Sequence, residues 1–199
     1  MNELLDITRE NALIILEKYL KKENYEKYKH SIRVAKICKV LAQTWNAPVE
    51  DAIISGLLHD IGKSMNKQEL LTLCMKKNLT IYDFELYANP MALHGKISSL
   101  LFEDEFNTKE PERFKNISHA ISCHVAGSTD MNILDKVLFI SDNIEPKKRI
   151  DLLHNVADGI INSPDECIKK IINDKISKSI EQKREVNPLL HSTLDSLER

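Results

Sequence analysis

An imidazole and a carboxylate stand side by side at His59-Asp60, directly after the apolar stretch 52–58. Adjacent helix positions differ by about 100°, so these two side chains point in neighbouring directions and can converge on one metal ion. Lys63 brings a cation to the same region one turn later. The alternative is an ordinary helix end, where His and Lys complement the helix dipole and Gly62 stops the helix. A metal site is therefore indicated only if other segments supply further ligands.

Further imidazoles and a second carboxylate occur at wide intervals along the chain. In order, the candidate ligands are His30, His59, Asp60, His94, His124 and Asp142. Gaps of 18 to 34 residues separate the five groups, which excludes a local metal finger and fits a helical bundle whose helices each contribute one or two ligands. Six ligands exceed what one catalytic ion with open positions uses, and suit two ions that share a carboxylate. Imidazole and carboxylate ligands suit iron, manganese, zinc, nickel or cobalt.

The segments that must position these ligands read as helices. Apolar residues at helical spacing predict helices over 3–21, 25–45, 48–61, 68–77, 94–102, 111–124, 131–144 and 164–184. The stretch 103–111 reads as a polar turn, and 78–90 as a loop or irregular helix of the kind that often covers a site. Hairpin-type strand pairs are not found. We predict an all-α fold, a helical bundle with the metal site at its centre, forming one domain over 1–199 with a core of about 25–145.

Helical spacing also predicts which histidines and carboxylates face inward. His30 shares a stripe with Val34, and Asp142 shares one with Leu138. A buried carboxylate without a partner is costly, so Asp142 is expected to meet a cation or a metal. His119 lies on the opposite side of its helix and is expected to face outward. The histidines expected to be ordinary polar side chains are His119, His154 and His191.

Composition excludes several functional classes. With 28 basic and 30 acidic residues the net charge is −2, which gives no general electrostatic case for binding nucleic acid. The four cysteines show no Cys-x-x-Cys spacing, so they are expected to be reduced thiols. No membrane-length apolar run or signal peptide is evident. We expect a cytoplasmic protein that does not bind membranes.

Five motifs extend this interpretation into a family resemblance. They are His30-Ser31-Ile32-Arg33-Val34-Ala35, Leu57-Leu58-His59-Asp60-Ile61-Gly62-Lys63, Leu93-His94-Gly95, Ala120-Ile121-Ser122-Cys123-His124 and Ile140-Ser141-Asp142-Asn143-Ile144-Glu145-Pro146. Their order resembles the HD-domain metal-dependent phosphohydrolases that hold two metals, and more closely the bacterial YqeK family. The resemblance covers nearly the whole chain and implies an HD-domain helical bundle. It also implies symmetrical hydrolysis of diadenosine tetraphosphate to two ADP, with nucleotides as small-molecule substrates.

The resemblance implies roles for particular residues. The first metal would be held by His30, His59, Asp60 and Asp142, and the second by Asp60, His94 and His124. Asp60 would be shared, and iron is the metal that the resemblance favours. The catalytic residues would be Asp60, Lys63 and Arg33. Of these, Lys63 and Arg33 would contact the phosphate groups. Lys148 or Arg149 would be a further substrate contact.

Alternatives remain open at the sequence level. Arg33 could be a surface residue, Lys63 a dipole-compensating lysine, and the basic run 147–149 a solvated cluster. The chain has Val125-Ala126-Gly127 where the family commonly has Thr-Thr-Gly or Thr-Ser-Gly, so substrate contacts are expected to differ there. An HD-domain nucleotidase acting on mononucleotides and a non-catalytic nucleotide-binding regulator are the competing functions. A homodimer is compatible with all three.

Overall fold

The computed structural model describes residues 4–145 and 162–198, and all regular elements in these ranges are helices. The α-helices are α1 (Arg9–Leu16), α2 (Tyr25–Thr44), α3 (Val49–Leu58), α4 (Lys67–Lys76), α5 (His94–Glu105), α6 (Pro111–Cys123), α7 (Ile133–Ile144), α9 (Pro164–Glu181) and α10 (Pro188–Ser196). Short 3-10 or π-helical segments are η1 (Glu17–Lys21), η2 (Ile61–Ser64), η3 (Phe84–Ala88) and η4 (Pro90–Leu93). The predicted all-α class is confirmed. Lys148, Arg149 and His154 lie outside the described residues.

Several predicted helix boundaries were wrong, and local chemistry explains why. The first helix begins at Arg9 because the Thr8 side chain accepts a hydrogen bond from the backbone N–H of Asn11 and caps it. The helix predicted over 48–61 ends at Leu58 and continues as the 3-10 segment η2. The predicted turn 103–111 is shorter, because α5 runs on to Glu105.

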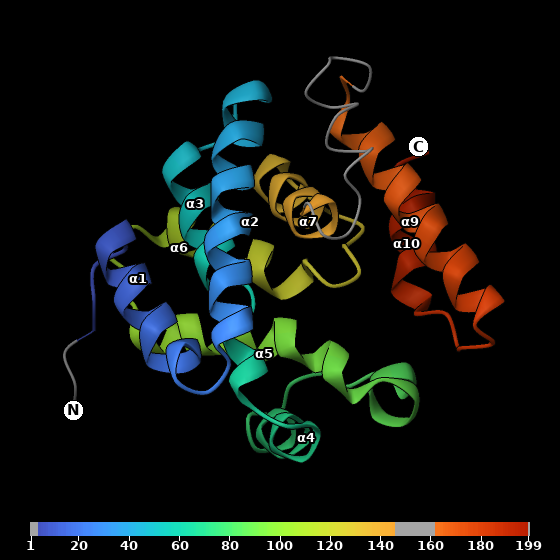
Figure 1. The fold of residues 1–199 in the computed structure, drawn as a ribbon, viewed down its shortest axis with the longest axis horizontal. Coiled ribbons are helices and arrows are strands. Elements are labelled where there is room, and N and C mark those ends of the chain that lie inside the picture. Colours follow the sequence, from blue (N-terminus) through green and yellow to red (C-terminus); the bar gives the residue numbers. More distant parts are fainter. Residues whose placement is uncertain (1–3, 146–161, 199) are drawn as a thin grey trace.

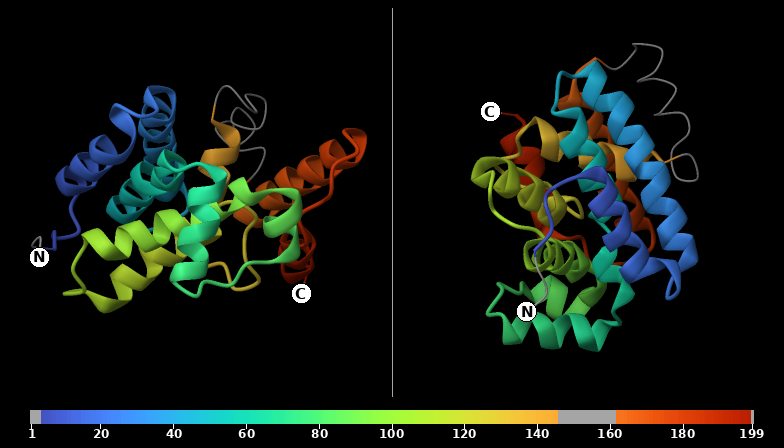
Figure 2. Two further views of the ribbon diagram at one scale, coloured as in Figure 1. Left: turned by 90° about the horizontal axis from the view of Figure 1, so that it is seen from below. Right: turned by 90° about the vertical axis from the view of Figure 1, so that its left-hand side faces the viewer.

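The helices pack around a continuous apolar core. In Figure 1, α2 stands at the front, with α1 and α3 on one side of it and α7 on the other, and α9 and α10 form the far edge. Figure 2 shows the same order from below, with α1 and α10 at opposite ends of the molecule. Fully buried side chains include Leu58, Ile97, Phe102 and Phe139, so α3, α5 and α7 all contribute to the core. None of the described helices combines the length and apolarity needed to cross a bilayer.

A glycine lets α2 and α3 approach each other closely. A Cβ at Gly56 would lie 2.8 Å from the Cα of Ala35, a distance that side chains do not reach. This contact brings α2, at a point five residues after His30, against the end of α3, which leads into His59 and Asp60. The backbone packing of these two helices thus sets the distance between two of the candidate ligand groups.

Candidate metal centre

Three of the four candidate histidines are oriented by the helix ends on which they lie. Each follows the last residue of a helical segment: His59 after α3, His94 after η4 and His124 after α6. In each, Nδ1 donates a hydrogen bond to the carbonyl three residues earlier, at 2.9 Å to Gly56, 2.6 Å to Met91 and 2.7 Å to Ile121. A carbonyl only accepts, so Nδ1 carries the proton and Nε2 of the neutral ring has a lone pair. Every ring therefore presents Nε2 as a metal ligand.

The two oxygens of Asp60 face different pairs of these rings. Oδ1 lies 3.2 Å from Nε2 of His94 and 3.7 Å from Nε2 of His124. Oδ2 lies 3.5 Å from Nε2 of His59 and 3.7 Å from Nε2 of His30. One carboxylate thus stands between two separate pairs of imidazoles, an arrangement suited to a ligand shared by two ions.

Asp142 completes the first of these groups. Its Oδ1 lies 2.9 Å from Nε2 of His30 and 3.7 Å from Nε2 of His59. Potential ligand atoms lie within 4.8 Å of one another in three overlapping sets: His30, His59 and Asp60; His59, His124 and Asp142; Asp60, His94 and His124. All six residues predicted from the sequence therefore meet in one place.

The residues present fit a metal centre. His59, Asp60 and His124 are almost completely buried. Among the described residues, Nε2 of His59 has no hydrogen-bond partner, although leaving a buried polar nitrogen unpaired costs about 1–3 kcal/mol. A cation between these rings and the carboxylates would satisfy that nitrogen and neutralise the two acids.

Electrostatics keep these groups in the protonation states that metals require. Burial lowers the pKa of His59, and it lowers the pKa of His94 to about 4, so both rings are neutral. Burial alone would raise the pKa of the Asp60 carboxyl, but the facing imidazoles and the Lys63 ammonium outweigh it and hold the pKa well below its usual range. Neutral imidazoles and an ionised carboxylate are the forms that bind divalent metals.

The two cations predicted to contact phosphate both lie beside the centre, and both already have carboxylate partners. Nζ of Lys63 is 2.7 Å from Oδ1 and 2.8 Å from Oδ2 of Asp60. Nε of Arg33 donates to Oε1 of Glu145 at 2.5 Å. Lys63 therefore stands directly at the shared carboxylate, whereas Arg33 reaches the centre through Glu145.

Glu145 is the residue that sequence reasoning missed. It is 2% exposed, and its Oε2 lies 3.8 Å from Nδ1 of His30. The Glu145 carboxylate thus faces Nδ1 of His30, whereas in the other three rings Nδ1 faces a backbone carbonyl. The sequence feature that could have indicated Glu145 is its position three residues after the candidate ligand Asp142, in the motif 140–146.

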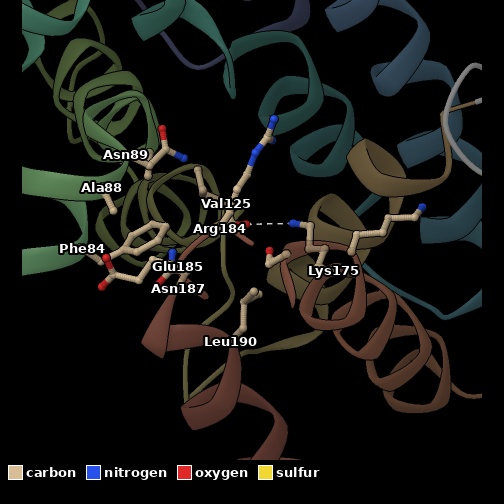
Figure 3. A pocket seen from close by; sticks show the side chains of 12 residues that line it. Phe84, Ala88, Asn89, Val125, Lys175, Arg184, Glu185, Asn187 and Leu190 are labelled. Atoms are coloured by element: carbon tan, nitrogen blue, oxygen red, sulfur yellow. Dashed lines mark hydrogen bonds between the residues drawn. The ribbon is translucent and has the colours of Figure 1, made fainter. Parts of the chain in front are cut away.

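A pocket is lined in part by Val125, the residue that follows the candidate ligand His124. It has a volume of about 630 Å³. Figure 3 shows Phe84 and Asn89 on one side of it and Lys175 on the other, with Lys175 donating to the carbonyl of Val125 at 3.0 Å. Val125 directly follows His124, and the segment predicted to cover a site, 78–90, supplies Phe84 and Asn89. Further cationic side chains in the lining are Lys178 and Arg184.

His119 is partly exposed, whereas we predicted that it faces outward without a buried partner. Its side chain is 35% exposed, and its Nδ1 donates to Oδ2 of the buried Asp135 at 3.0 Å. This hydrogen bond is the main reason that the pKa of His119 is raised. The position of Asp135 at the start of α7 brings it over the end of α6, which helical spacing within α6 could not indicate.

Comparison with known proteins assigns this arrangement to a family. The family model for the HD domain matches residues 28–147, which include all six candidate ligands. The chain belongs to the HD domain family. The fold of the whole HD protein is similar to the crystal structure of a predicted HD superfamily hydrolase involved in NAD metabolism from Clostridium acetobutylicum. The TM-score is 0.83 at 21% identity, covering 98% of both chains.

Three curated relatives of this HD protein bear the name symmetrical bis(5'-nucleosyl)-tetraphosphatase. The protein from Halalkalibacterium halodurans is 27% identical over 143 residues, 72% of each chain. The one from Bacillus subtilis is 24% identical over 78% of this chain and 81% of its own length. The one from Staphylococcus aureus is 28% identical over 73% of both.

Proposed function

We propose that this HD protein is a metal-dependent hydrolase that cleaves dinucleoside tetraphosphates symmetrically into two nucleoside diphosphates. The observation that carries the proposal is the position of Asp60, whose two oxygens face two separate pairs of histidines. The three curated relatives named for this reaction support the substrate. The reaction fits the cytoplasm, where nucleotides are made and where the four free thiols of the chain stay reduced.

Two ions are proposed, which would share Asp60 as a ligand. The first would be held by His30, His59, Asp60 and Asp142, and the second by Asp60, His94 and His124. When bound, such ions act as Lewis acids that stabilise charge on phosphoryl oxygens and activate water. Iron is the proposed metal, on the basis of the family resemblance, and imidazole and carboxylate ligands are compatible with it.

The protein's own residues would hold the rest of the substrate. Lys63, at the shared carboxylate, would contact the phosphoryl group under attack, and a charge-assisted contact of this kind strengthens as negative charge develops. The pocket beyond Val125 offers an aromatic ring at Phe84 and cations at Lys178 and Arg184. We propose that it receives the departing nucleoside diphosphate.

Chromatography of early time points with diadenosine tetraphosphate tests the proposal. Metal-loaded protein should release ADP as the only nucleotide product, because one diphosphate half lies at the ions and the other leaves. Equal amounts of ATP and AMP would contradict symmetrical cleavage. Faster release of inorganic phosphate from mononucleotides would instead favour a nucleotidase. Binding of the dinucleotide without any turnover would favour a regulator.

A further inference from the structure

A second group of metal-ligating side chains lies outside the candidate centre. His119 and Cys123 are four residues apart on α6, so they lie on the same face one turn apart. Asp135 reaches them from the first turn of α7. One potential ligand atom from each of these residues lies within 4.8 Å of those of the other two. Nitrogen, sulfur and oxygen donors from two helices thus meet at one point.

One carboxylate oxygen in this group lacks a partner. Asp135 is completely buried. Its Oδ2 accepts hydrogen bonds from the backbone N–H of Asn132 at 2.7 Å and from Nδ1 of His119 at 3.0 Å. Oδ1 has no hydrogen-bond partner among the described residues. A buried unpaired oxygen on an acid is costly, and a cation here would satisfy it.

We propose that His119, Cys123 and Asp135 form a separate binding site for a zinc-like divalent ion. Tetrahedral Zn²⁺ accepts thiolate, imidazole and carboxylate together, and ligand distances of about 2.0–2.3 Å put neighbouring donor atoms roughly 3.3–3.7 Å apart. The separation of 3.0 Å between Nδ1 of His119 and Oδ2 of Asp135 is close to this, and Oδ1 of the same carboxylate is the oxygen without a partner. The six ligands proposed for the catalytic centre include no cysteine, so of these two sites this one offers the thiolate that zinc favours.

Ion binding at this site has a defined proton balance. Cys123 must lose its thiol proton to solvent, because the thiolate is the ligand. Nδ1 of His119 must be free of its proton, so the neutral ring must carry it on Nε2. Oδ1 of Asp130 lies 3.6 Å from Nε2 and can accept a hydrogen bond from that N–H after a small movement. Asp130 would then orient the imidazole, as carboxylates commonly do for metal-bound histidines.

The position of this site indicates a structural role. Cys123 immediately precedes His124 at the end of α6, and Asp135 lies on α7, the helix that also carries Asp142. Two ligands proposed for the catalytic centre thus belong to the two segments that the ion would join. An ion held by α6 and α7 would therefore tie the two segments together. This inference does not depend on which nucleotide the protein hydrolyses.

Cobalt substitution tests the proposal on the whole protein. Metal-stripped protein titrated with Co²⁺ should develop the near-ultraviolet charge-transfer absorption that only thiolate ligation produces. Cys123→Ser should abolish this band, and His119→Gln should weaken Co²⁺ binding at this site at least about tenfold. Cys74→Ser is the matched control and should keep the band, because Cys74 is a buried free thiol of α4.

Zinc stoichiometry supplies the second measurement. Bound zinc should fall by one equivalent in Cys123→Ser and in His119→Gln, while Cys74→Ser matches the unmodified protein. Circular dichroism checks that each variant is folded, and the two substitutions on different donors give independent tests. A band that is absent from the unmodified protein, or that persists in Cys123→Ser, would overturn the proposal.

Discussion

Asp60 is the residue on which both proposed ions depend. Asp60→Asn keeps the shape of the side chain but removes its charge, so each ion loses an anionic ligand. We expect metal content to fall at both positions and hydrolysis to drop at least about 1,000-fold, since metal ions supply several kcal/mol of charge stabilisation. His191→Ala, at an exposed histidine, is the control and should change neither. Full metal content with full activity in Asp60→Asn would disprove the shared-ligand arrangement.

Glu145 is expected to orient His30. The other three rings are held by backbone carbonyls, whereas Nδ1 of His30 faces the Glu145 carboxylate that Arg33 binds. Glu145→Gln should weaken metal binding about 10-fold to 100-fold, the usual effect of losing such a supporting carboxylate. Equilibrium dialysis against a graded series of metal concentrations measures this. Unchanged affinity would show that packing alone fixes the His30 ring.

At the scale of helices, the contact between α2 and α3 makes a prediction about stability. Gly56→Ala places a methyl group 2.8 Å from the Cα of Ala35, so the two backbones must separate. Overpacking of this kind costs about 1–3 kcal/mol, which outweighs the helix propensity that Ala gains over Gly. Urea unfolding should show the loss. Thr72→Ala, an exposed position in α4, should leave stability nearly unchanged.

The link between α6 and α7 is expected to depend on pH when no metal is bound. The hydrogen bond from His119 to Asp135 raises the pKa of His119 above its unfolded value of about 6.5. Its stabilisation is therefore fully present below about pH 6.5 and is lost as the pH rises through the folded pKa. In the presence of a chelator, the free energy of unfolding should be higher for the unmodified protein than for His119→Gln. This difference should be larger at about pH 5.5 than at about pH 9. A difference that stays constant with pH would contradict this.

The sequence predicted the helices and the ligand set better than it predicted contacts between elements. Helical spacing placed His30 inward, and the structure buries it. The partner of Arg33 and the burial of Glu145 could not be predicted, because both depend on how segments far apart in sequence pack. The hydrogen bond between His119 and Asp135 could not be predicted for the same reason, since Asp135 lies on the next helix. Metal ligation by the six residues stays a prediction that the geometry supports.

At the scale of the whole molecule, α9 and η3 together line a pocket that neither forms alone. Lys178→Ala should raise the KM for diadenosine tetraphosphate roughly 10-fold, since a hydrogen bond to a charged group contributes about 1.5–3 kcal/mol. Metal content should not change, because Lys178 is not among the proposed ligands. Lys170→Ala, an exposed lysine of the same helix outside the pocket lining, is the matched control. Equal KM values for the two variants would remove Lys178 from the substrate site.

The local hydrogen bonds of the histidine rings have a consequence for how the protein is made. Each of His59, His94 and His124 is oriented by a carbonyl only three residues earlier, whereas His30 and Asp142 meet across 112 positions of sequence. On the ribosome, the rings can adopt their orientation one helix at a time, but the last ligand emerges only with α7. The complete set of proposed ligands is therefore present only after α7 has been made. We expect that a cell short of the metal would accumulate protein whose rings are already oriented, and that added metal would activate it without new synthesis.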